Sequence, residues 1–145
     1  MRPINSTLIG HVAASADRVF SLLTDPATIP SWLPGCAWAE TTGGGPMRKG
    51  AHLKVRFGQR TTDFEVVDFS PYSTFGWVER GQRQGAKTFF LLQNTAGATA
   101  ITIKNVWQPQ SLGAWVRGKL FPKRNVKRVM DGTVNNLRML VLRKN

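Results

Sequence analysis

The sequence predicts an α+β protein in which a curved antiparallel sheet of about six to seven strands wraps around one long C-terminal helix. Two observations carry this prediction. From Leu53 to about residue 109, apolar and polar side chains alternate with a period of two, as in antiparallel strands with one face in water. Over residues 126–141, apolar side chains recur every three or four positions, as on one face of a helix.

The N-terminal part predicts one strand followed by two short helices. Residues 4–12 form the expected strand, and Ser15 has a side chain suited to cap a helix that ends near Thr24. Asp25 and Pro26 suit the start of the second helix, because proline lacks the N–H that would be unpaired there. The apolar residues expected to be buried on the two helices are Val19, Phe20, Leu22, Leu23, Ile29, Trp32 and Leu33.

A run of antiparallel strands joined by short turns is expected next. Within it, the apolar phase moves from Phe64 and Val66 to Val67 and Phe69, which predicts a bulge or a section buried on both faces. The expected strands cover residues 53–57, 61–69, 74–80, 86–94 and 99–109.

The C-terminal part returns to a helical period from Ser111. Pro122 is expected to kink or break this helix, because an interior proline removes a hydrogen bond and clashes with the preceding turn. The apolar stripe of the second piece consists of Val126, Met130, Val134, Leu137 and Val141. Because one helix cannot fill the whole concave face of a twisted sheet, we expect bulky side chains or a ligand to occupy the remainder.

The composition is that of a globular protein. The 145 residues are 41% hydrophobic and 19% charged, and we expect one domain spanning residues 1–145. Cys36 is the one cysteine, which excludes an internal disulfide. No apolar run approaches the ~20 residues of a membrane span, and the N-terminus lacks the apolar core of a signal peptide, so we expect a cytoplasmic protein.

The formal net charge of +12 is concentrated toward the C-terminus, where nine Lys and Arg residues lie from Arg117 onward with Asp131 as the one acid. We expect a solvated basic helix face. A second hypothesis is that the basic and aromatic segment Ser111–Arg128 rests on an anionic membrane and admits a lipid. Nucleic-acid binding is not favoured, because no recognition motif accompanies the charge.

Several segments match a known family in type and order. They are residues 19–26 (VFSLLTDP), residues 29–35 (IPSWLPG), Gly50 before a strand, residues 64–71 (FEVVDFSP) and residues 97–99 (GAT). On these segments the chain, nearly end to end, resembles the START-like or SRPBCC superfamily, and within it the polyketide cyclase/dehydrase and lipid-transport group with the helix-grip fold. The resemblance implies an internal cavity for a small hydrophobic molecule, and members of the group bind lipids, hormones or polyketides with the same frame.

Candidate site residues are chosen for apolar bulk, because large flat side chains often wall ligand cavities. The apolar candidates are Trp32, Trp38, Phe57, Phe75, Trp77, Phe89, Trp107, Trp115, Met130 and Val134. Asn105 is the main polar candidate, with Thr88 and Gln93 behind it; its amide either bonds a neighbouring part of the chain or presents a donor and an acceptor to a ligand. Gly132, inside the last helix, indicates close packing or room for a ligand, or else a glycine tolerated on the surface.

The titratable residues give little support for catalysis. His11 and His52 are the only histidines and have no metal-ligand spacing, so we expect no metal site and no cofactor. Glu65 and Asp68 are expected to pair with Arg or Lys on the outer face. Cys36 suits a buried small side chain as well as a reactive thiol.

Three functions therefore stay open at this point. The leading hypothesis is binding, transport or sequestration of a small hydrophobic molecule, such as a lipid or an aromatic polyketide, by a monomer or homodimer. The alternative is a polyketide cyclase or dehydratase, which needs a cavity-facing acid or base that the sequence does not reveal. The third is a lipid binder associated with an anionic membrane through its basic C-terminal region.

Overall fold

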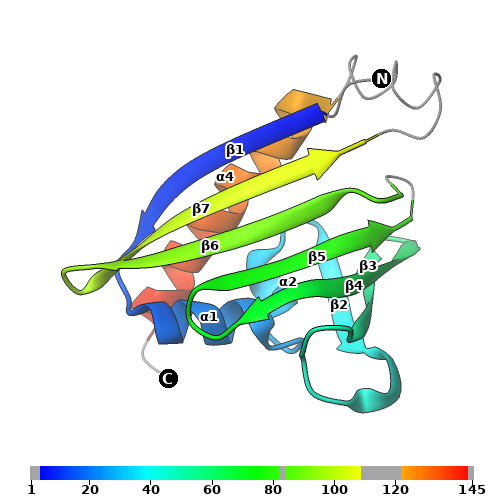
Figure 1. The fold of residues 1–145 in the computed structure, drawn as a ribbon, viewed down its shortest axis with the longest axis horizontal. Helices are drawn as coiled ribbons and strands as arrows, with labels where there is room; N and C mark the ends of the chain where they lie inside the picture. The colour runs from blue at the N-terminus through cyan, green and yellow to red at the C-terminus, as the bar shows by residue number, and fades with distance from the viewer. Residues whose placement is uncertain (1–3, 82–83, 109–121, 144–145) are drawn as a thin grey trace.

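The computed structural model describes residues 4–81, 84–108 and 122–143 (Figure 1). The elements are β1 (Ile4–Val12), α1 (Ala16–Thr24), α2 (Ile29–Trp32), β2 (Cys36–Thr41), the 3₁₀ turn η1 (Thr42–Gly44), β3 (His52–Phe57), β4 (Arg60–Ser70), β5 (Thr74–Arg80), β6 (Lys87–Thr95), β7 (Ala98–Trp107) and α4 (Pro122–Leu142). None of the described helices is both long enough and apolar enough to cross a membrane.

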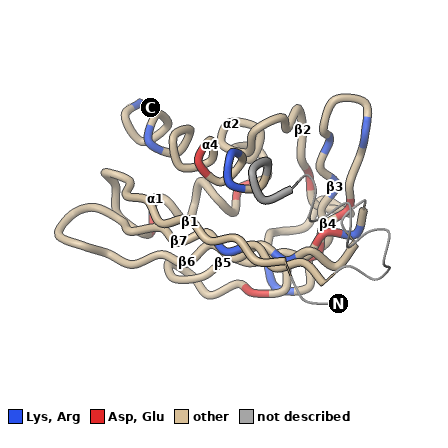
Figure 2. Tube along the Cα trace, turned by 90° about the horizontal axis from the view of Figure 1, so that it is seen from above, with Lys and Arg blue, Asp and Glu red and all other residues tan. Residues whose placement is uncertain are grey.

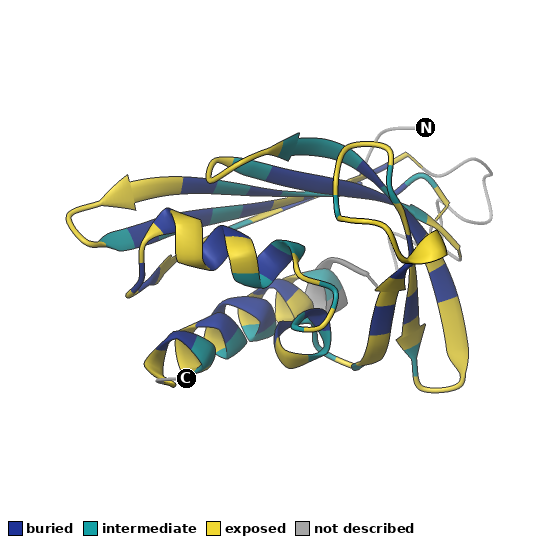
Figure 3. Ribbon diagram, turned by 90° about the horizontal axis from the view of Figure 1, so that it is seen from below, coloured by how far each residue is buried: buried dark blue, intermediate teal, exposed yellow. Residues whose placement is uncertain are grey.

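The strands form one antiparallel sheet in the order β1-β7-β6-β5-β4-β3-β2. Each strand from β2 to β7 pairs with its neighbour in sequence, and β1 closes onto β7 with Ile4 opposite Trp107 and Val12 opposite Thr99. The sheet curves, and the helices lie together on its concave side (Figures 1 and 3). This confirms the α+β, helix-grip prediction.

Alternation along the strands decides which side chains face the helices. Inward-facing residues of the sheet and the apolar residues of α1, α2 and α4 form one buried core. Its largest fully buried members are Trp32, Phe75, Leu23, Ile29, Leu53, Ile101, Ile103 and Leu137. A smaller separate cluster contains Ile4, Ala86 and Trp107.

Side-chain hydrogen bonds to backbone carbonyls attach α4 to both neighbouring layers. Asn136 Nδ2 donates to the Trp32 carbonyl at 3.1 Å, and Arg138 Nε donates to the His11 carbonyl at 2.9 Å. The helix is thus tied to α2 on one side and to β1 on the other. Both attachments lie in its second half.

The predicted bulge is confirmed, because the register between β4 and β5 shifts between Val66 and Asp68. The C-terminal prediction is confirmed only in its second piece. Pro122 is the first residue of α4, where a missing N–H costs no helix hydrogen bond, and the expected first piece up to residue 121 lies outside the described residues.

Two expectations about helix starts were wrong. Ser15 occupies the N-cap position of α1, yet its side chain accepts no capping bond; its hydroxyl donates to the carboxylate of Asp17, and Asn94 Oδ1 accepts from the Ala16 N–H at 3.0 Å instead. The second helix begins at Ile29 and not at Pro26, because the Asp25 carboxylate closes a turn before it by accepting from the Ala27 N–H at 3.0 Å.

Candidate ligand cavity

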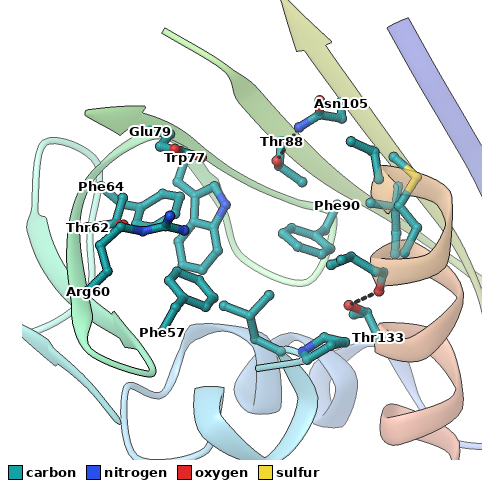
Figure 4. A pocket seen from close by; sticks show the side chains of 16 residues that line it. Phe57, Arg60, Thr62, Phe64, Trp77, Glu79, Thr88, Phe90, Asn105 and Thr133 are labelled. Carbon is teal, nitrogen blue, oxygen red and sulfur yellow. Dashed lines mark hydrogen bonds between the residues drawn. The ribbon is translucent and has the colours of Figure 1, made fainter. Parts of the chain in front are cut away.

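A cavity of about 550 Å³ lies between the concave face of the sheet and the first half of α4 (Figure 4). This volume is within the range of small-molecule sites, roughly 300–1,000 Å³. Its lining comes from the segment after α2, from β3 to β7 and from α4: Leu33, Pro34, Phe57, Arg60, Thr62, Phe64, Trp77, Glu79, Thr88, Phe90, Ile103, Asn105, Val126, Val129, Met130 and Thr133.

Trp77 is at the centre of the aromatic wall. Its ring centroid is 4.5 Å from that of Phe64 and 6.3 Å from that of Phe90, and the latter two rings also line the cavity. Behind it lies Trp32, stacked with Trp77 at 6.1 Å and fully buried, with its indole Nε1 donating to the Leu22 carbonyl at 2.8 Å. Trp77 is therefore held in place by a rigid core and presents a ring to the cavity.

The segment after α2 forms the opposite wall and rests on α4. A Cβ built at Gly132 would come within 3.0 Å of Pro34 Cγ, so the absence of a side chain at this helix position lets Pro34 pack closely. Of the three roles that the sequence offered for Gly132, the structure shows close packing. Pro34 occupies the space above this glycine and itself lines the cavity.

Two charged side chains line the cavity, and sequence analysis selected neither. Glu79 follows Trp77 by two positions, so alternation places both on the inner face of β5; that signal was available in the sequence. Arg60 was expected in a turn, but it is the first residue of β4 and lies opposite Phe57 in the register. Both charged side chains are drawn at the sheet side of the cavity in Figure 4.

A polar pair sits in the wall next to Trp77. Asn105 Nδ2 donates to Thr88 Oγ1 at 2.9 Å, and the two residues face each other across β6 and β7. Asn105 is buried, Thr88 is half-buried, and both line the cavity. The amide thus bonds a neighbouring strand while it also borders the cavity.

Five predicted site residues are brought together around the cavity by the structure: Phe57, Trp77, Thr88, Asn105 and Met130. They come from β3, β5, β6, β7 and α4, so only the folded sheet and helix unite them. That they contact a ligand stays a prediction.

The other predicted site residues lie elsewhere. Trp32 and Phe75 belong to the fully buried core, and Val134 packs against Gly10 of β1. Trp107 belongs to the small cluster with Ile4 and Ala86.

Three aromatic candidates remain. Phe89 packs over Gly76 on the face of β6 opposite to Phe90. Trp38 is 40% exposed on β2, and Trp115 lies outside the described residues. Gln93, one of the two weaker polar candidates, is exposed.

Metal and histidine chemistry find no support in the described part of the chain. His11 and His52 are exposed and do not line the cavity, and no group of three His, Cys, Asp or Glu residues there could hold a metal ion. Burial raises the pKa of the Cys36 thiol above its ordinary value, which favours the protonated form. Glu65 pairs with Arg80 at 3.0 Å, as expected.

The expected basic helix face is present where the structure describes it. Lys127, Arg128 and Arg138 of α4 are exposed. Lys and Arg residues also occur along the sheet, so the positive charge is not confined to the helix (Figure 2). Most of the segment Ser111–Arg128, on which the membrane hypothesis depends, lies outside the described residues.

Comparisons with known proteins agree with this architecture. The family described as polyketide cyclase / dehydrase and lipid transport matches residues 7–141. None of the curated protein sequences compared matches the chain.

Solved structures with the same fold have little sequence in common with this chain. Protein MLL2253 from Mesorhizobium loti has a TM-score of 0.76 at 14% identity, covering 98% of this chain and 99% of its own. The Aha1 dimer from Colwellia psychrerythraea has a TM-score of 0.64 at 19% identity, with 95% and 97% covered. The di-domain ARO/CYC StfQ from the steffimycin biosynthetic pathway has a TM-score of 0.74 at 12% identity, covering 94% of this chain and 50% of that one. At these identities the structures show the fold alone, whereas the family match covers nearly the whole chain. The chain therefore belongs to the polyketide cyclase / dehydrase and lipid-transport family of the START-like superfamily.

Proposed function

We propose that the protein binds a small hydrophobic molecule, a lipid or an aromatic polyketide, in the cavity between the sheet and α4. The observation that carries the proposal is the aromatic wall of Phe57, Phe64, Trp77 and Phe90 facing a space of about 550 Å³. Apolar rings that border a cavity gain free energy when a ligand removes them from water, by about 25 cal/mol for each Å² of apolar surface.

The family match supports this class of ligand, and the steffimycin-pathway structure supports the polyketide version of it. The geometry is compatible with either, because both ligands are apolar bodies with a few oxygen atoms. The lining offers aromatic faces to the body and a small number of polar groups to the oxygens.

A second candidate function is a cyclase or dehydratase reaction in the same cavity, and Glu79 is the observation that favours it. Cyclisation of a polyketide removes a proton from a carbon beside a carbonyl, and a cavity-facing carboxylate is a suitable base. Glu79 is half-buried in the lining of the cavity. Glu79→Gln distinguishes the two functions. If the protein is an enzyme, the unchanged protein turns over an aromatic polyketide substrate, and the variant still binds this substrate but no longer turns it over. If it is a binding protein, neither the unchanged protein nor the variant shows turnover.

Ligand binding is tested by closing the cavity. Val129 lines it and is 40% exposed, so Val129→Trp places a large ring at its edge. Met139→Trp, at a 61% exposed position of the same helix outside the lining, is the matched control. The probe is 1-anilinonaphthalene-8-sulfonate, followed by its fluorescence and by the melting temperature of the protein.

We expect Val129→Trp to weaken dye binding by roughly tenfold or more, and Met139→Trp to leave it unchanged. Equal binding by both variants would place the dye elsewhere on the protein and remove the proposal. Native mass spectrometry of protein purified from its own source adds the identity of any co-purifying molecule.

A further inference from the structure

A row of polar side chains crosses the concave face of the sheet beside the aromatic wall. In the register of the sheet, Ser6 of β1 lies opposite Asn105 of β7, Asn105 lies opposite Thr88 of β6, and Thr88 lies opposite Trp77 of β5. Ser6 and Asn105 are each 7% exposed. Buried polar groups in proteins generally have hydrogen-bond partners, so the donors and acceptors of this row indicate what a ligand could bind.

The hydroxyl of Thr88 is an acceptor in its bond with Asn105. A threonine hydroxyl has one proton and two lone pairs, and the Asn105 Nδ2–H occupies one lone pair at 2.9 Å. In the described part of the chain this is the one side-chain hydrogen bond of Thr88. The Thr88 proton is therefore available for donation from a half-buried position in the lining of the cavity.

The donor lies at the edge of the aromatic wall. Thr88 is the direct cross-strand neighbour of Trp77, and Phe90 follows it by two positions on the same face of β6. In Figure 4, Thr88 lies between Asn105 and the rings of Trp77 and Phe90. A flat ligand against these rings brings a substituent on its edge to the hydroxyl.

We propose that the cavity selects flat, apolar ligands that carry an aryl ketone or quinone carbonyl, whose oxygen accepts a hydrogen bond from the Thr88 hydroxyl while the rings pack against Trp77. This inference rests on the proposed binding function and narrows its ligand class. A carbonyl oxygen has no proton of its own, so it complements a donor, and the bond from Asn105 orients that donor.

The test uses two ligands that differ by one group. 2-Acetylnaphthalene and 2-ethylnaphthalene have nearly the same shape, and a carbonyl in the first replaces a methylene in the second. The protein variants are Thr88→Val, which keeps the shape of the side chain and removes the hydroxyl, and Thr88→Ser, which keeps the hydroxyl. The measured quantity is the ratio of the two dissociation constants in each protein, obtained from quenching of tryptophan fluorescence.

We expect the ratio to favour the ketone by roughly tenfold more in the unchanged protein than in Thr88→Val, and the comparison rests on this ratio because the loss of the Thr88 acceptor can change affinity for both ligands. Thr88→Ser is expected to keep the preference. A second readout is the emission of bound 6-propionyl-2-(dimethylamino)naphthalene, which shifts to the red when its carbonyl accepts a hydrogen bond. It should shift to the blue in Thr88→Val, an effect that a merely structural role of Thr88 would not produce.

Other outcomes identify what failed. If both naphthalenes bind and Thr88→Val leaves their ratio unchanged, the carbonyl assignment is wrong while hydrophobic binding stands. If neither ligand binds, nor the anilinonaphthalene dye, the proposed function fails with it. If 2-naphthoate binds more tightly than the ketone, and Arg60→Gln rather than Thr88→Val abolishes the difference, the selective contact belongs to Arg60 and the inference is overturned.

Discussion

Gly10 of β1 lies directly against Val134 of α4, and a Cβ built on Gly10 would come within 2.8 Å of Val134 Cγ1. The missing side chain lets the middle of the helix touch the sheet. The cavity lining on α4 ends at Thr133, one residue before this contact. The helix therefore contacts the sheet at Val134, and the cavity lies beside the part of the helix that precedes this contact.

Gly10→Ala is expected to lower the free energy of unfolding by about 1–3 kcal/mol, because the added methyl overpacks the contact with Val134. Urea denaturation followed by tryptophan fluorescence measures it. The control is the double variant Gly10→Ala with Val134→Ala, which should be less destabilised than the sum of the single changes. Strictly additive effects would show that the two positions do not interact.

Trp77→Ala is expected to abolish most of the rise in melting temperature that an apolar dye produces, because Trp77 presents its ring to the cavity. Trp107→Ala is the matched control: it is also a buried tryptophan of the sheet, but it packs with Ile4 and Ala86 outside the lining. Differential scanning fluorimetry with and without the dye gives both shifts. Equal losses in the two variants would contradict the assignment of the cavity as the dye site.

The strands could be predicted because alternation is a strong signal wherever one face is polar. Residues 53–57 and 74–80 were predicted nearly as found, and the shift at Val66 correctly indicated the bulge. The strand β2 was not predicted. It is a short edge strand with only Ala39 and Thr41 buried, and Trp38 is exposed on it, so its sequence has no apolar side to reveal a period.

The site was harder to predict than the fold, because alternation tells which face a residue occupies and not how deep it lies. Phe75 and Trp77 share a face of β5 and both belong to the buried core, yet only Trp77 lines the cavity. In β6, apolar residues run without interruption from Phe89 to Leu92, so alternation cannot tell which of them face the helices. Phe89 was predicted to line the cavity, but the residue that faces inward is Phe90, which lies opposite Ile103 in the register.

The charged lining residues were missed for a different reason. Sequence reasoning treats charged side chains as solvent-facing, which is correct for most of them. Glu79 is near the end of its strand, where an inward-pointing carboxylate reaches the edge of a cavity and stays partly exposed. Alternation from Trp77 would have indicated that Glu79 faces inward, whereas composition alone would not have indicated this.

Cys36 is expected to react slowly at neutral pH. Burial raises the pKa of its thiol above the ordinary value, so the thiolate that attacks alkylating reagents is scarce at pH 7 and its fraction grows only at alkaline pH. The rate of iodoacetamide labelling, measured by mass spectrometry from pH 7 to 10, should rise later with pH than that of the same chain unfolded in urea. A folded protein that labels as fast as the unfolded chain at pH 7 would show a reactive thiol instead.

Thr99→Val tests a buried link between the sheet and the corner before α1. Thr99 is fully buried at the start of β7, and its Oγ1 donates to the Ala14 carbonyl at 2.7 Å. Valine keeps the shape of the side chain but leaves that carbonyl without its donor, so we expect a loss of about 1–3 kcal/mol in the free energy of unfolding. Thr102→Val is the matched control on the same strand: Thr102 is half-buried on the opposite face and should change stability by less than about 0.5 kcal/mol. Urea denaturation compares the two, and an equal, small effect at both positions would mean that water or a backbone adjustment satisfies the Ala14 carbonyl as well as the threonine does.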